Sequence, residues 1–150
     1  MIDLKGTEIK YGDFIAMQKV DLHVREGEFF TLLGPSGCGK TSLLRMITGF
    51  IAPSQGRIYI KDRDVTDVSV EKRGVGIVFQ SYAIFPTMNV FENIAFGLRV
   101  QRLSATEVEE KVFEIAKMVD LSKEQLYRKA SELSGGQQQR VAIARALILK

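Results

Sequence analysis

The sequence has 150 residues, of which 45% are hydrophobic, and this length allows one core of ordinary size, in a single domain or in part of a larger one. Its 21 basic and 18 acidic residues give a formal net charge of +3 and are spread along the chain, without the basic patch that a nucleic-acid partner requires. The single cysteine, Cys38, excludes an internal disulfide, and no apolar run reaches the ~20 residues of a membrane span. Because the N-terminus carries Asp3 and no apolar core, we expect no signal peptide and a reducing, cytosolic environment.

The first part of the chain is predicted to be rich in strands. Short alternating pieces over residues 2–24 are typical of a small antiparallel layer. Phe29–Leu33 and Val75–Phe79 are apolar throughout, which predicts two strands that are buried on both faces. Between them, Arg57–Ile60 follows a turn signal and is predicted to form another strand.

From Ser104 onward the pattern is helical. Ser104 with Glu107 forms a capping box before an apolar stripe at helix spacing, and Ser122 with Gln125 repeats this signal for a short second helix. After the two glycines that follow Ser134, a further helix is predicted, whose stripe consists of Val141, Ala144 and Ile148.

A glycine-rich loop lies between a predicted strand and the helix expected at about residues 40–47. Residues Gly34 to Thr41 match G-x-x-x-x-G-K-[ST], a pattern in which backbone N–H groups and a helix N-terminus surround phosphate oxygens. In this pattern Lys40 would reach the β and γ phosphates, and the Thr41 hydroxyl would help to hold Mg²⁺. The alternative is a glycine-rich turn that only joins a strand to a helix. The pattern and its flanks favour phosphate binding.

A second anion-binding construction is predicted near the end of the chain. Leu133-Ser134-Gly135-Gly136-Gln137 places a hydroxyl and two glycines at the N-terminus of a helix, without a lysine. An N-cap serine followed by an ordinary loop explains the same residues. If both helix ends serve one triphosphate, two chains that face each other head to tail could each complete the other's nucleotide site.

Three segments carry a family resemblance: LLGPSGCGKTSLLRMITGF, VFQSYAIFPTMNVFENIAFGL and LSGGQQQRVAIARAL. Together they resemble the nucleotide-binding subunit of an ATP-binding cassette (ABC) transporter over essentially all 150 residues. The resemblance implies an α/β fold that combines a P-loop NTPase-type sheet, an N-terminal antiparallel β layer and an α-helical subdomain. It places the β layer and P-loop core at about residues 1–97 and the helical subdomain with the signature helix at about residues 98–150.

The resemblance also assigns roles to individual residues. Tyr11 would stack on the adenine of ATP with Ala16 near the same base, although Tyr11 alone also fits a strand-end aromatic. Gln80 would meet Mg²⁺ and the attacking water and sense the membrane partner, whereas on its own it fits a polar residue that satisfies loop backbone groups. The phosphate loop would comprise Gly34, Pro35, Ser36, Gly37, Cys38, Gly39, Lys40 and Thr41, with Ser42 close by. The signature that completes the other subunit's site would be Ser134, Gly135, Gly136 and Gln137.

An aromatic and methionine-rich cluster surrounds Pro86 and fits either local core packing or an apolar groove for a partner helix. The resemblance implies that the region from Gln80 to Phe91 meets transmembrane permease subunits, with the protein at the cytoplasmic face of the membrane. We therefore expect part of this cluster to be exposed. Its members are Tyr82, Ile84, Phe85, Met88 and Phe91.

Hydrolysis in this class requires an apolar strand that ends in Asp, a following Glu and a later His, and the sequence has no acidic residue beyond Glu132. The sequence thus resembles the first part of such a subunit, truncated before the Walker B motif and incomplete at its C-terminus. We expect ATP hydrolysis from the full-length protein, and weak nucleotide binding with little or no hydrolysis from these residues alone.

Two functions stay open. The first is the ATP-hydrolysing subunit of a membrane importer for polyamines, ferric iron, phosphonates, sulfate or sugars, with the polyamine type slightly favoured. The alternative is a binding-only cassette or a non-transport ABC ATPase.

Overall fold

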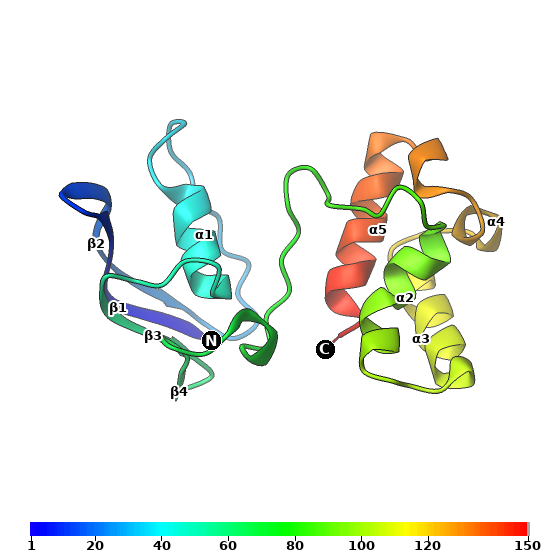
Figure 1. Ribbon diagram of the computed structural model, residues 1–150, viewed down its shortest axis with the longest axis horizontal. Helices are drawn as coiled ribbons and strands as arrows, with labels where there is room; N and C mark the ends of the chain where they lie inside the picture. The colour runs from blue at the N-terminus through cyan, green and yellow to red at the C-terminus, as the bar shows by residue number, and fades with distance from the viewer. Residues whose placement is uncertain (150) are drawn as a thin grey trace. The chain divides into compact units, whose positions relative to one another are not determined.

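The computed structural model describes residues 1–149, and the chain divides into two compact units, residues 1–75 and a second unit that begins at Gly76 (Figure 1). The division expected near residues 97 and 98, between the P-loop core and the helical subdomain, stays a prediction. The elements of the first unit are β1 (Ile2–Tyr11), β2 (Phe14–Val24), α1 (Lys40–Thr48), β3 (Gln55–Ile60), β4 (Arg63–Asp64) and the 3-10 turn η1 (Val70–Lys72).

The first unit is built on an antiparallel sheet with the strand order β2-β1-β3-β4. Ile2 of β1 pairs with Val24 of β2 on one side and with Ile60 of β3 on the other. The predicted antiparallel layer and the predicted strand at Arg57–Ile60 are therefore confirmed. A single core joins the sheet to one face of α1, through Leu4, Ile9, Met17, Leu43, Met46, Ile47, Ile58 and Val65.

Arg73 fixes the C-terminal end of α1. Its buried guanidinium donates hydrogen bonds to the carbonyls of Met46 (2.9 Å) and Ile47 (3.0 Å) in the last turn of α1, and to those of Thr66 (2.9 Å) and Val68 (2.7 Å). Burial lowers the pKa of Arg73 from its ordinary value. Because the last carbonyls of a helix have no partner within it, this contact satisfies them and holds α1 in place below the phosphate loop.

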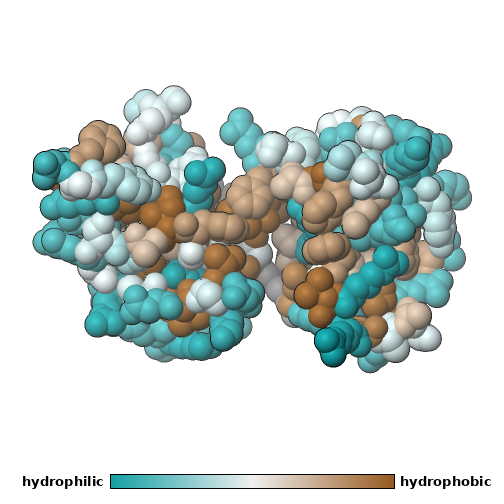
Figure 2. All heavy atoms as spheres, viewed as in Figure 1, coloured by the Kyte–Doolittle hydropathy of each residue, from teal (hydrophilic) through white to brown (hydrophobic). Residues whose placement is uncertain are grey.

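The prediction of two buried strands is wrong in both cases. Phe29–Leu33 is irregular, with Phe29 96% and Leu33 89% exposed. Figure 2 shows that both units carry apolar surface among hydrophilic residues. Val75–Phe79 is also irregular, and Val78 is exposed. A central strand needs a ladder partner on each side, and neither segment pairs with a strand within residues 1–149. The phosphate loop and Gln80 therefore follow irregular segments.

The second unit is helical, and four of its helices begin with a capping box. Each such cap contributes about 1 kcal/mol to helix stability. The starts predicted at Ser104 and Ser122 are confirmed, whereas the helix that begins after Asn89 was not predicted. The elements are α2 (Val90–Val100), α3 (Ala105–Met118), α4 (Lys123–Leu126), the 3-10 turn η2 (Ala130–Glu132) and α5 (Gly135–Leu147).

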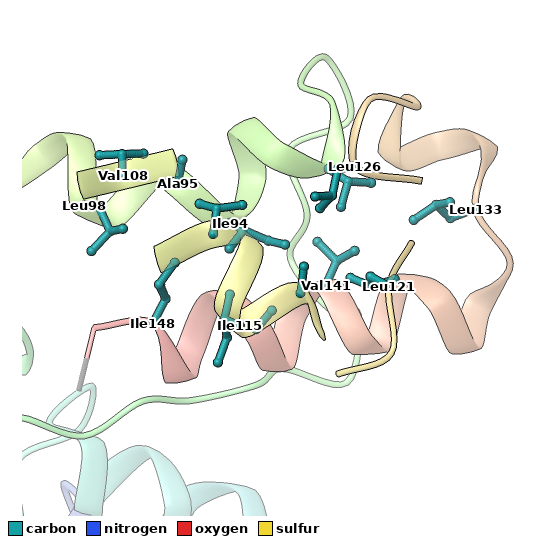
Figure 3. Packing of buried hydrophobic residues seen from close by; sticks show 14 residues of the cluster. Ile94, Ala95, Leu98, Val108, Ile115, Leu121, Leu126, Leu133, Val141 and Ile148 are labelled. Carbon is teal, nitrogen blue, oxygen red and sulfur yellow. The ribbon is translucent and has the colours of Figure 1, made fainter. Parts of the chain in front are cut away.

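The core of this unit lies between α2, α3 and α5, whose buried side chains point toward one another (Figure 3). The stripe predicted for the last helix is confirmed, since Val141, Ala144 and Ile148 are all buried. Ile94 and Leu98 of α2 complete the same core. None of the helices in the described residues combines the length and the apolar character that a membrane span requires.

Candidate nucleotide-binding site

The phosphate loop ends at Gly39, the N-cap residue of α1. Gly39 has φ 91°, a left-handed conformation that favours glycine, and no side chain caps the helix there. The first N–H groups of α1 therefore remain available for an anion, which the positive end of the helix dipole also attracts. The predicted start of this helix at Lys40 is confirmed.

The side chain of Lys40 folds back onto the phosphate loop. Its ammonium donates hydrogen bonds to the carbonyls of Gly34 (2.8 Å) and Pro35 (2.7 Å), and it lies 3.3 Å from Sγ of Cys38. The contact with Lys40 lowers the pKa of the exposed Cys38 thiol. Three of the predicted loop residues, Gly34, Pro35 and Cys38, thus contact the Lys40 ammonium, at a site that is exposed to solvent.

Thr41 and Ser42 are the hydroxyl residues of the first turn of α1. Thr41 is exposed and Ser42 is half-buried. A Thr hydroxyl fits one oxygen position of Mg²⁺, an ion that keeps most of its other positions for water and substrate phosphates. The chemistry of this residue therefore suits a metal held between the loop and bound phosphates.

The structure places the second strand beside the loop. A Cβ on Gly39 would lie 3.8 Å from the carbonyl oxygen of Ala16 and 3.7 Å from Cγ of Met17, so β2 contacts the N-terminus of α1 directly. Tyr11 stands at the end of β1, opposite Phe14, with 58% of its surface exposed. Ala16 is thus brought to the phosphate loop, and Tyr11 presents a free aromatic face at the hairpin of the same sheet.

The signature segment caps α5 in the second unit. The Ser134 hydroxyl accepts a hydrogen bond from the backbone N–H of Gln137 (3.4 Å), and the Gln137 side chain accepts one from the Ser134 N–H (3.0 Å). Gly135 and Gly136 are exposed. The capping box occupies the N–H groups of Ser134 and Gln137, so Gly135 and Gly136 supply the exposed backbone of this helix N-terminus.

A hollow of about 850 Å³ lies beside this helix end. Its lining combines apolar side chains with the cations Lys117, Lys123 and Arg140, of which Arg140 is paired with Asp120 at 2.6 Å. The positive charge of Lys117 and Lys123 and the N-terminus of α5 both favour an anionic neighbour.

Gln80 is exposed, at the start of a turn that follows the first irregular residues of the second unit. The cluster that follows it is neither fully exposed nor fully buried, since Tyr82, Ile84, Phe85, Met88 and Phe91 are all half-buried. Complete burial, the outcome that would contradict a docking role, is not found. Gln80 and this cluster lie in one continuous stretch of the second unit.

A lysine and a hydroxyl residue at the start of a helix, after a glycine-rich loop, define a P-loop phosphate-binding protein. Residues 17–150 match the family model described as ABC transporter, and the chain belongs to this family. The resemblance that the three sequence segments carry is therefore confirmed.

The chain is similar to two curated relatives, both named spermidine/putrescine import ATP-binding protein PotA. It is 52% identical to the protein of Photobacterium profundum over 150 residues, covering 100% of this chain and 40% of that protein. Its identity to the protein of Vibrio cholerae serotype O1 is also 52%, with the same coverage. The chain thus spans about 40% of the length of these curated relatives.

Solved structures show the same fold. The dimeric post-hydrolysis state of the ATP-binding cassette MJ0796 bound to ADP and Pi is 35% identical, with a TM-score of 0.85 over 99% of this chain and 69% of that one. CbiO1 of Clostridium perfringens, part of the ABC transporter complex cbiONQ, is 26% identical, with a TM-score of 0.88 over 99% of this chain and 61% of that one. The fold is therefore that of an ATP-binding cassette, with its antiparallel sheet and helical part, and the predicted fold class is confirmed.

Two residues that organise the second unit escape the sequence patterns. Asn93 is buried in α2, and its amide makes hydrogen bonds with the backbone of residues 85–89. Arg145 of α5 donates hydrogen bonds to two carbonyls more than sixty residues earlier in the chain. The contacts of Arg145 span too much of the sequence to leave a periodic signal. The start of α2 could have been found, because Asn89 and Glu92 form a capping box.

Proposed function

We propose that this chain is the ATP-binding part of a polyamine importer of the spermidine/putrescine type. The observation that carries this proposal is 52% identity along all 150 residues to proteins named for spermidine and putrescine import. Identity of this extent covers the phosphate loop, the region after Gln80 and the signature segment together. The protein would work at the cytoplasmic face of the membrane, where it would couple ATP hydrolysis to uptake.

The first unit would hold the nucleotide. Lys40 would exchange its bonds with the loop carbonyls for the β and γ phosphates, and the first N–H groups of α1 would bind phosphate oxygens. Thr41 would supply one ligand to Mg²⁺, an ion that neutralises phosphate charge when it is bound. Tyr11 would stack on adenine, and Ala16 would border the same base beside Gly39.

The second unit would complete the site of another copy. Ser134, Gly135, Gly136 and Gln137 form a helix N-terminus without a lysine, so they suit the far side of a triphosphate whose near side is held by a phosphate loop. A head-to-tail homodimer would bring two such halves together. Gln80 would orient water and metal, and the segment from Gln80 to Phe91 would contact the transmembrane permease subunits.

Nucleotide binding is tested by Lys40→Met in the protein produced from its own gene. Each charge-assisted bond to phosphate contributes about 1.5–3 kcal/mol, so affinity for a fluorescent ATP analogue should fall at least about tenfold. Lys72→Met is the matched control, because Lys72 is an exposed lysine of the same unit in η1, away from the loop. Equal affinities in the wild type and in both variants would contradict the proposal.

A further inference from the structure

The turn after Gln80 is held in an unfavourable backbone conformation. Tyr82 and Ala83 have φ values of 60° and 48°, in the left-handed region that residues with a side chain rarely adopt. Two consecutive residues in this conformation persist only where their surroundings fix them. Contacts within the second unit therefore hold the turn.

Arg145 makes the contacts that hold this turn. Its guanidinium donates one hydrogen bond to the carbonyl of Ala83 (2.7 Å) and another to that of Tyr82 (3.1 Å). The same group lies over the Phe85 ring, 5.3 Å from its centroid. The Phe85 ring is in turn packed against that of Phe96, with 4.7 Å between the centroids. The planar guanidinium therefore bonds two successive carbonyls and stacks on the next aromatic residue at once.

The chain before Gln80 is held on the same part of α5. A Cβ on Gly76 would lie 2.8 Å from the carbonyl oxygen of Ala146, so only glycine permits this close approach. Gly76 and the turn at Tyr82 thus meet neighbouring residues of α5 on either side of Gln80. Gln80 lies between two attachment points on one helix, and the N-terminus of this helix is the signature segment.

We propose that Arg145 is a positioning residue that ties the Gln80 turn to α5, so that the turn and the signature segment move as one body. The consequence of this tie rests on the proposed function. If a membrane partner displaces the Gln80 to Phe91 region, Arg145 would transmit the displacement to α5 and thus to Ser134. The signal needs no contact between the partner and the nucleotide. Arg145 touches neither nucleotide nor reacting atoms in this role.

A simpler role for Arg145 is to provide a positive charge in the last turn of α5, where it would interact with the helix dipole. Lysine would serve that role equally well, because it keeps the charge. Lysine cannot bond both carbonyls through a planar fork and stack on Phe85. Arg145→Lys therefore separates charge at the helix end from the positioning contact.

The experiment compares amide hydrogen exchange of residues 81–85 in the protein as produced from its own gene. We expect exchange about tenfold faster in Arg145→Ala than in the wild type, and an intermediate rate in Arg145→Lys. Arg99→Ala is the matched control, because Arg99 is an exposed arginine in the last turn of α2, and it should leave this exchange unchanged. In the complex with its membrane partner, Arg145→Ala should lower partner-stimulated ATP hydrolysis about tenfold and change affinity for an ATP analogue less than twofold.

Unchanged exchange at residues 81–85 in Arg145→Ala would overturn the proposal, and so would an Arg145→Lys protein that matches the wild type in exchange. If Arg145→Ala does not fold, Arg145→Lys alone decides between these outcomes. A wild-type complex without partner-stimulated hydrolysis would contradict the proposed function, while the exchange measurement would still decide the role of Arg145.

Discussion

Replacement of Asn93 by leucine removes a buried amide that fixes the segment before α2. The side-chain oxygen Oδ1 of Asn93 accepts a hydrogen bond from the Phe85 N–H (2.8 Å). The Asn93 NH₂ group donates to the carbonyls of Phe85 (3.1 Å), Met88 (3.3 Å) and Asn89 (2.9 Å). The side chain is fully buried, so water cannot replace these partners without a local rearrangement.

The expected cost follows from which groups lose every partner. Three carbonyls keep another donor, since the Phe85 carbonyl still accepts from the Met88 N–H, that of Met88 from the Ala130 N–H and that of Asn89 from the backbone N–H of residue 93. The Phe85 N–H is left unpaired, which costs about 1–3 kcal/mol, and the lost bonds to the carbonyls add roughly 1 kcal/mol. Leucine regains part of this through its apolar contacts. We expect a net loss of about 2–3 kcal/mol.

Chemical denaturation monitored by circular dichroism measures this loss as a change in midpoint at constant m-value. Gln139→Leu makes a comparable change of an amide side chain to leucine at an exposed position of α5, and it should cost less than about 0.5 kcal/mol. A cost for Asn93→Leu no larger than that of Gln139→Leu would show that the amide does not hold the segment, and would refute the reasoning.

Two other predictions concern the nucleotide site. Because Lys40 lowers the pKa of Cys38, its thiolate forms at a lower pH than that of an ordinary cysteine. The rate at which iodoacetamide modifies Cys38 should therefore rise with pH around a lower midpoint in the wild type than in Lys40→Met. Identical midpoints in the two proteins would contradict the contact. Ser134→Ala and Ser104→Ala each remove an N-cap and should each lower stability by about 1 kcal/mol, but only Ser134→Ala should reduce ATP turnover of the protein produced from its own gene. Equal turnover in the two serine variants would argue against a nucleotide role for the signature segment.

Local sequence signals predicted the starts of α1, α3, α4 and α5, whereas α2 was not predicted. The boxes at Ser104 and Ser122 start helices because the hydroxyl and the third residue satisfy each other's backbone groups within one turn. The start of α1 at Lys40 depends on glycine at the N-cap, another local requirement. The capping box at Asn89 starts α2 in the same way, although Gly97 and the aromatic residues of this helix have lower helix propensity.

The two irregular segments, residues 29–33 and 75–79, could not be predicted from local sequence patterns. An apolar run such as Phe29–Leu33 indicates that a segment is suited to burial. A strand also needs backbone hydrogen-bond partners, and these lie elsewhere in the chain. Arg145 illustrates the same limit for the site, because its carbonyl partners are set by tertiary packing. The phosphate loop was predictable since its sequence pattern and the Lys40 contacts that close it fall within eight consecutive residues, Gly34 to Thr41.

Uptake of radiolabelled spermidine tests the central claim most directly, in a strain that lacks the gene and carries either the wild-type gene or Lys40→Met. The account predicts that the wild type restores uptake, that excess unlabelled putrescine competes, and that Lys40→Met restores almost none while Lys72→Met behaves as the wild type. Spermidine uptake that is the same with and without the wild-type gene, or that is fully restored by Lys40→Met, would contradict it.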